Sequence, residues 1–124
     1  MQRKLLVVED NVYLREFMKT SLESLGYEVL LAHDGSEAIR LAISHHPDLA
    51  IIDILMPNLD GFQLASLIRK NPETQSLKML AMTASTPRTR AQFLAGGFDG
   101  YIGKPFTARE LDVEIKKLLE EPVG

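Results

Sequence analysis

The sequence contains no cysteine, has no excess of basic residues and carries no long hydrophobic run. Without cysteine there are no disulfide bonds, thiolate metal sites or cysteine nucleophiles. Lysine and arginine total 14 against 17 aspartate and glutamate residues, and the formal net charge of −3 gives no reason to expect nucleic-acid binding. No apolar run approaches the roughly 18 residues that a membrane span needs, so membrane insertion is not expected either.

The length and the balance of residue types are those of one globular domain. With 124 residues, 45% of them hydrophobic and 25% charged, the chain can bury roughly two thirds of its unfolded surface in a single core. We see no linker or repeat and therefore expect one domain over residues 1–124. Met1 leads through Gln2, Arg3 and Lys4 into the first predicted strand without a signal peptide, which predicts a cytoplasmic protein.

Short apolar runs alternate with helical patterns along the chain. Strands are predicted at Arg3–Val8, Tyr27–Ala32, Asp48–Asp53, Leu77–Met82 and around Gly100–Ile102. Helices are predicted by apolar spacing at Leu14–Leu25, with Gly26 as its stop, at Ala38–Ile43, at Gly61–Lys70 with Leu64, Leu67 and Ile68 buried, at about Pro87–Ala95, and after a capping box that opens at Thr107. Because strands separated by helices run parallel, the pattern predicts an α/β fold.

Reactive side chains follow the strands at the points where the strands end. Glu9 and Asp10 come after the first strand, Asp53 ends the third, Thr83 follows the fourth and Lys104 follows the fifth. Parallel strands bring their carboxyl ends to one edge of the sheet, and open parallel sheets bind ligands there. We therefore expect three carboxylates, a hydroxyl and an ammonium group to converge on one site.

This set of groups is typical of a site for a divalent metal and a phosphoryl group. Two carboxylates about 4 Å apart repel by about 4 kcal/mol at an effective dielectric constant near 20, so a cation is needed between them. Hard oxygen ligands favour Mg²⁺ or Mn²⁺ over zinc. Lys104 and Thr83 can meet phosphoryl oxygens. Asp53 is the best candidate nucleophile toward phosphorus, because it ends the central and most rigid strand.

These residues, taken in order, resemble the response-regulator receiver domain of two-component signalling over essentially the full chain. The matching pieces are Glu9-Asp10, Asp53, Met56-Pro57, Asp60-Gly61, Thr83-Ala84, Gly96, Tyr101 and Lys104-Pro105-Phe106. The resemblance implies a flavodoxin-like, doubly wound fold. In that fold a five-stranded parallel sheet of order 2-1-3-4-5 is flanked by five helices.

The resemblance also implies a role for each residue of the site. Asp53 would accept the phosphoryl group from a histidine kinase or a histidine phosphotransfer protein. Asp10 and Asp53 would bind Mg²⁺ directly, together with the backbone carbonyl of Leu55, while Glu9 would act mainly through water. Lys104 would contact the phosphoryl group, and its bond to the following proline is usually cis in this family.

Thr83 and Tyr101 correspond to the switch pair of that family. On phosphorylation the hydroxyl moves toward the phosphate and the aromatic ring follows inward. This changes the face made by the fourth helix, the fifth strand and the fifth helix, where a downstream protein or output domain usually docks. Phe93 lies in the predicted fourth helix, where it is expected in the core, with an interface anchor as the alternative.

The resemblance also implies that two neighbouring positions tune the lifetime of the aspartyl phosphate. Leu55 lies two residues beyond Asp53, and Ser85 lies two residues beyond Thr83. Because an apolar side chain cannot orient water by hydrogen bonding, Leu55 predicts slow self-dephosphorylation. Leu55 also weighs against a phosphohydrolase, because aspartate-based phosphatases usually carry a second aspartate at this position.

A third class of function is a receiver-like binding module that acts without phosphate. The complete set of acidic residues and the lysine favours phosphorylation instead, since modules of that kind typically lose part of the set. The sequence leaves open whether the chain is a stand-alone regulator or a receiver domain from a larger protein.

Overall fold

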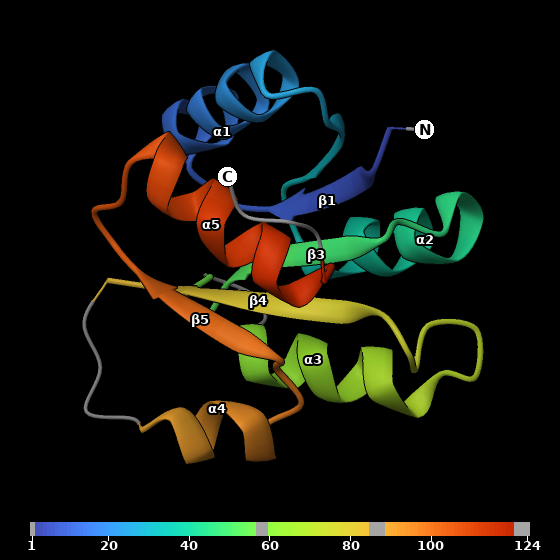
Figure 1. The fold of residues 1–124 in the computed structure, drawn as a ribbon. Helices are drawn as coiled ribbons and strands as arrows, with labels where there is room; N and C mark the ends of the chain where they lie inside the picture. Colours follow the sequence, from blue (N-terminus) through green and yellow to red (C-terminus); the bar gives the residue numbers. More distant parts are fainter. Residues whose placement is uncertain (1, 57–59, 85–88, 121–124) are drawn as a thin grey trace.

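The computed structural model describes residues 2–56, 60–84 and 89–120 (Figure 1). Its strands are β1 (Lys4–Val8), β2 (Glu28–Ala32), β3 (Leu49–Asp53), β4 (Lys78–Thr83) and β5 (Gly100–Gly103). They form one five-stranded sheet in the order β2-β1-β3-β4-β5, and every neighbouring pair is parallel. The predicted fold class and strand order are confirmed, and the predicted strand bounds differ from the observed ones by a single residue.

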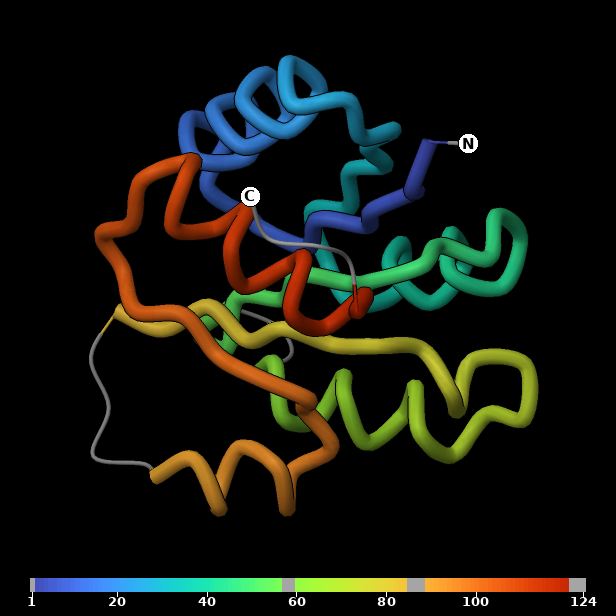
Figure 2. Tube along the Cα trace, viewed as in Figure 1, coloured from blue at the N-terminus to red at the C-terminus, as the bar shows by residue number. Residues whose placement is uncertain are grey.

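The helices lie in two layers on either side of the sheet (Figures 1 and 2). They are α1 (Val12–Ser24), α2 (Gly35–His45), α3 (Gly61–Lys70), α4 (Arg90–Ala95) and α5 (Ala108–Leu118). One face of the sheet packs on α1 and α5, through Met18, Leu22, Leu111 and Ile115. The other face packs on α2, α3 and α4, through Ala38, Ala42, Leu64, Ile68 and Phe93.

Coverage on both faces explains why the strands are apolar without a break. In β1, Leu6 and Val8 point into one core cluster while Leu5 and Val7 point into the other. All five residues of β3 are buried. A strand that is buried on both faces and hydrogen-bonded on both edges has little freedom to move, so the side chain of Asp53 at its end has a rigid base.

Two helix predictions need correction. Leu67 was predicted to be buried in α3, but it is 46% exposed, because Leu64, Ala65 and Ile68 fill the stripe that faces the sheet. Helix α4 was predicted from about Pro87, which lies outside the described residues, and the observed helix starts at Arg90. Thr89 caps it and forms a capping box with Gln92, a pattern that the sequence also contains.

Capping and a close approach fix the two loops that lead away from the acidic strand ends. The Asn11 side chain caps α1 directly after Glu9 and Asp10. Asp60 and Gln63 form a capping box at the start of α3. The first residue of α3 has to be glycine, because a Cβ atom on Gly61 would lie 2.6 Å from the Cα atom of Ile54. The start of α3 therefore packs directly against the backbone that follows Asp53.

No helix in the described part of the chain has the length and apolar character that crossing a bilayer requires.

Candidate metal centre

Three carboxylates meet at the carboxyl edge of the sheet, as predicted. One oxygen from each of Glu9, Asp10 and Asp53 lies within 4.8 Å of the others. Glu9 and Asp53 are buried, with 1% and 4% of their surface exposed, whereas Asp10 is exposed. The cluster thus has a buried side formed by the ends of β1 and β3 and an open side at Asp10.

Lys104 supplies the positive charge at this edge. Its Nζ atom lies 2.9 Å from Asp53 Oδ2 and 3.3 Å from Glu9 Oε1. The Lys104 backbone N–H donates to the carbonyl oxygen of Thr83 at 2.6 Å, and the Lys104–Pro105 bond is cis. Burial lowers the pKa of Lys104, but its hydrogen bonds and charge attraction to the two carboxylates outweigh burial, so the net pKa is raised and the ammonium stays charged.

Glu9 has a raised pKa in the fold. Burial raises its pKa to about 7, and the nearby charge of Asp53 acts in the same direction. A hydrogen bond from the backbone N–H of Asn11 to Glu9 Oε2 (3.1 Å) and the attraction of Lys104 oppose the rise. The two buried carboxylates of Glu9 and Asp53 share a single positive charge, that of Lys104. This is the electrostatic condition that a bound cation relieves.

The two carboxylate oxygens of Asp53 accept hydrogen bonds from different partners. Oδ2 accepts from Lys104, while Oδ1 accepts from the backbone N–H of Leu55 at 3.0 Å. These contacts hold the carboxylate at the end of β3 with both oxygens defined. The Leu55 side chain points outward and is 65% exposed, so it covers no part of the core.

Thr83 ends β4 next to this carboxylate, since Asp53 pairs with Met82 in the sheet. The Thr83 side chain is buried, and its Oγ1 atom has no hydrogen-bond partner in the described part of the chain. A buried hydroxyl without a partner is costly and uncommon. Such a hydroxyl beside Asp53 is ready to donate to an oxygen that enters the site.

Tyr101 is the second residue of β5. Its side chain is 40% exposed, and its ring stacks on Phe93 with 4.7 Å between ring centroids. Phe93 itself is fully buried, so the prediction of a core residue is confirmed. Ser85, the other position expected to influence the site, lies outside the described residues.

Arg15 is a site neighbour that the sequence analysis missed. From α1, its guanidinium donates to the carbonyl oxygen of Glu9 at 2.9 Å and reaches that of Asp10 at 3.5 Å. These contacts stabilise the backbone at Glu9 and Asp10, two of the three acidic residues of the cluster. The only sequence signal is a basic residue in the first turns of the helix that follows the acidic pair, and this is too common a feature to stand out.

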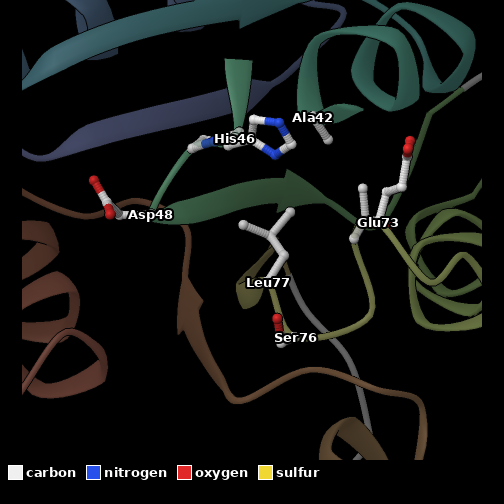
Figure 3. Close-up of a pocket in the computed structure, with 8 residues that line it drawn as sticks. Ala42, His46, Asp48, Glu73, Ser76 and Leu77 are labelled. Carbon is white, nitrogen blue, oxygen red and sulfur yellow. The ribbon is translucent and has the colours of Figure 1, made fainter. Parts of the chain in front are cut away.

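A separate cavity of about 270 Å³ lies at the opposite edge of the sheet (Figure 3). Its lining includes His46 and Asp48, which precede β3, and Ser76 and Leu77, which precede β4. The Asp48 carboxylate already accepts from the backbone N–H of Lys4 at 2.8 Å. This cavity therefore shares no residue with the acidic cluster and brings together no comparable set of charged groups.

The donor set at the carboxyl edge fits a hard divalent cation. Mg²⁺ binds carboxylate and carbonyl oxygens, keeps several waters, and uses only one or two carboxylates from a protein. Here three carboxylates converge, one of them facing solvent, and two are buried with an excess of negative charge. The hydroxyl of Thr83, which has no partner among the described residues, and the ammonium of Lys104 are left for an anion beside the cation.

The chain belongs to the response regulator receiver domain family, whose profile matches residues 5–116. It is therefore a receiver domain of two-component signalling. Among curated relatives, it is 36% identical over 118 residues to the probable transcriptional regulator ycf27 of Cyanophora paradoxa. That match covers 95% of this chain and 48% of the relative. The chain spans about half the length of the curated relatives it matches.

Solved structures of the same family superpose closely on this one. The chemotaxis protein CheY4 of Vibrio cholerae has a TM-score of 0.89 and 29% sequence identity, covering 95% of this chain and 99% of that one. The receiver domain of the sensor histidine kinase PA1611 from Pseudomonas aeruginosa PAO1 has a TM-score of 0.87 and 30% identity, covering 98% and 100%. The PA1611 receiver domain holds a magnesium ion in its active site cleft.

Proposed function

We propose that this receiver domain, taken as residues 1–124, is a phosphorylation-controlled switch whose phosphoryl acceptor is Asp53. The observation that carries the proposal is the pairing of Asp53 with Lys104 at 2.9 Å inside a cluster of three carboxylates. The Asp53 carboxylate lies beside the ammonium of Lys104, and together with the other two carboxylates it would bind a cation. Both charges are needed before an anionic phosphoryl group can approach a carboxylate.

Asp10 and Asp53, with the backbone carbonyl of Leu55, are the residues that would hold Mg²⁺, and Glu9 would act through water. Mn²⁺ suits the same oxygen ligands. When bound, the cation offsets the negative charge of the carboxylates and of the phosphoryl oxygens. With a cation bound, the Glu9 carboxylate would be repelled less by Asp53, and its burial would cost less free energy.

The transfer itself is a substitution at phosphorus. A carboxylate oxygen of Asp53 forms a bond to phosphorus while the bond from phosphorus to the imidazole nitrogen of a phosphohistidine breaks. The imidazole, which carries a proton on its other ring nitrogen, leaves as a neutral ring with the bonding electron pair, and the product is an aspartyl phosphate on Asp53. Lys104 meets one of the phosphoryl oxygens, and the hydroxyl of Thr83 donates to another. This chain therefore contributes positioning and charge, and needs no acid or base of its own.

A histidine kinase or a histidine phosphotransfer protein would supply the phosphohistidine from which the group is transferred. The response goes to a downstream protein or an output domain, through the face formed by α4, β5 and α5. That face carries Tyr101 and a hollow lined by residues of all three elements, including Arg90, Glu114 and Lys117. We place this domain in the cytoplasm. Its only catalysis is of its own phosphorylation and slow dephosphorylation.

Intact mass measured after incubation with Mg²⁺ and acetyl phosphate tests the proposal. We expect the wild-type chain to gain one phosphoryl group only when Mg²⁺ is present, and Asp53→Asn to gain none. Asp48→Asn is the matched control, because Asp48 precedes the same strand at the opposite edge and is expected to leave phosphorylation unchanged. If neither acetyl phosphate nor a phosphohistidine donor modified the wild-type chain, the domain would act as a binding module without phosphorylation.

A further inference from the structure

Four of the eight aromatic residues gather in one cluster between the sheet and helices α3 and α4. The rings of Phe62 and Phe93 lie 5.6 Å apart, and those of Phe62 and Phe98 lie 5.3 Å apart at nearly a right angle. Phe93 and Phe98 complete a triangle at 6.4 Å. Tyr101 joins this triangle only through Phe93 among the ring pairs of the described residues, at 4.7 Å and with 12° between ring planes.

Phe93 is a buried residue on which the Tyr101 ring stacks. Phe93 and Phe98 are buried almost completely, whereas Tyr101 is 40% exposed. Phe62 packs directly against the end of α4 in the space that Gly96 leaves free, because a Cβ atom on Gly96 would lie 2.4 Å from a ring carbon of Phe62. The buried rings therefore hold Phe93 in place, and Phe93 offers its remaining face to the one ring that reaches solvent.

We propose that Phe93 is a positioning residue that holds the Tyr101 ring in its exposed position and so sets the resting state of the switch. The inference rests on the proposed function, because it concerns the movement of Tyr101 toward Thr83. If the ring turns inward, its stack on Phe93 is lost. Aromatic pairs of this kind shift an equilibrium by about twofold to tenfold, and here the shift favours the exposed, unphosphorylated arrangement.

This role differs from ordinary core packing in what it predicts for Phe98. Phe98 has the same side chain, is buried to the same extent and contacts Phe62 and Phe93, but has no ring contact with Tyr101. Replacing either phenylalanine with leucine removes a comparable amount of core contact. Only the change at position 93 also removes the base on which the Tyr101 ring rests, so the two variants form a matched pair.

The test is the nuclear Overhauser effect between the Tyr101 ring and the Thr83 methyl group in the unphosphorylated protein. This contact reports the inward ring directly and does not depend on the ring current of Phe93. We expect Phe93→Leu to raise the inward population by about twofold to tenfold, and Phe98→Leu to leave it at the wild-type level. Phe93→Met, whose unbranched side chain adapts better to an irregular gap, replaces Phe93→Leu if the latter does not fold.

The proposal is overturned if the Tyr101–Thr83 contact is the same in Phe93→Leu and wild type, or rises equally in Phe98→Leu. The measurement needs no phosphoryl donor, so it separates the two proposals. A shifted ring in a protein that neither acetyl phosphate nor a phosphohistidine donor modifies would support the role of Phe93 and contradict phosphorylation. A phosphorylated protein with an unshifted ring would do the reverse.

Discussion

Lys104 and Asp53 are 51 residues apart in the sequence, yet Lys104 Nζ lies 2.9 Å from Asp53 Oδ2. The same ammonium also reaches Glu9, which is 95 residues away from it in the sequence. One lysine at the end of β5 thus holds together the ends of β1 and β3 across the sheet. Several consequences for stability and metal binding can be measured.

Replacing Lys104 with methionine should destabilise the metal-free protein and tighten its binding of Mg²⁺. The variant leaves Glu9 and Asp53 buried without their cation, and we expect a loss of about 1–3 kcal/mol in the free energy of unfolding, because the Lys104 head group is only partly buried. Mg²⁺ no longer competes with the ammonium for Asp53. Urea denaturation with and without Mg²⁺ measures both effects.

Lys117→Met is the control for this change. Lys117 forms an exposed ion pair with Glu114 on α5, far from the acidic cluster, so its loss should change the stability by less than about 0.5 kcal/mol. Equal losses in the two variants, or weaker Mg²⁺ binding in Lys104→Met, would contradict the role assigned to Lys104.

The stability of the metal-free protein should fall as the pH rises from about 4.5 to about 7. The pKa of Glu9 is raised from 4.5 in the unfolded chain to about 7 in the fold, because burial disfavours the charged carboxylate. A group with a raised pKa stabilises the fold below its unfolded pKa, and that contribution is lost as the pH passes the folded value. From this shift the loss is on the order of 3 kcal/mol.

Mg²⁺ should reverse much of that loss, because the cation stabilises the charged form of Glu9. We therefore expect the rise in melting temperature caused by Mg²⁺ to be larger at pH 8 than at pH 5.5. Glu9→Gln keeps an oxygen that can accept from Asn11 but cannot ionise, and its pH dependence should be flatter. A Glu9→Gln protein with the wild-type pH profile would show that another group is responsible.

Thr83→Val should have opposite consequences in the two states of the protein. The buried Thr83 hydroxyl has no partner in the described residues, so its removal should leave the stability of the unphosphorylated protein unchanged or raise it by up to about 1 kcal/mol. In the phosphorylated protein the same change removes a donor to the phosphoryl group. The stabilisation produced by acetyl phosphate and Mg²⁺ should therefore shrink in Thr83→Val and persist in Thr83→Ser. Strong destabilisation of unphosphorylated Thr83→Val would mean that the hydroxyl has a structural partner.

Leu55→Asn should shorten the lifetime of the aspartyl phosphate. The Leu55 side chain is 65% exposed beside Asp53 and cannot orient a water molecule. One hydrogen bond to the attacking water corresponds to a rate increase of about twofold to tenfold. Leu67→Asn, at a leucine of α3 that is 46% exposed, is the control for adding an amide to the surface. The measurement is the loss of phosphoryl mass over time, and equal lifetimes in Leu55→Asn and wild type would contradict the prediction.

The sequence predicted the edge of the sheet at which Glu9, Asp53 and Lys104 meet, because parallel strands place their ends together. It could not predict which acid of the pair Glu9-Asp10 is buried. That depends on the direction of the backbone after β1, which the contacts of Asn11 and Arg15 help to fix. Helical spacing alone also wrongly predicted that Leu67 is buried. Helix α3 buries a narrower stripe against the sheet than its apolar residues span.

Specific side-chain contacts away from the strand ends had no signal in the single sequence. Arg69 at the end of α3 donates to the carbonyl oxygen of Gly97 and pairs with Asp99 at 2.9 Å, which joins α3 to the turn before β5. The stack of Tyr101 on Phe93 is of the same kind. Such pairs follow from the packing of whole elements, so they emerge only once the sheet and its helices are assembled.

The most direct measurement is the site of phosphorylation. The acyl phosphate formed with Mg²⁺ and acetyl phosphate can be trapped with borohydride, which reduces the phosphorylated aspartate to homoserine, and the modified residue can be located by peptide mass spectrometry. Phosphoryl transfer to Asp53 predicts homoserine at position 53 and unchanged carboxylates at Glu9 and Asp10. Reduction at either of those two acids, or a phosphorylated chain with Asp53 intact, would contradict it.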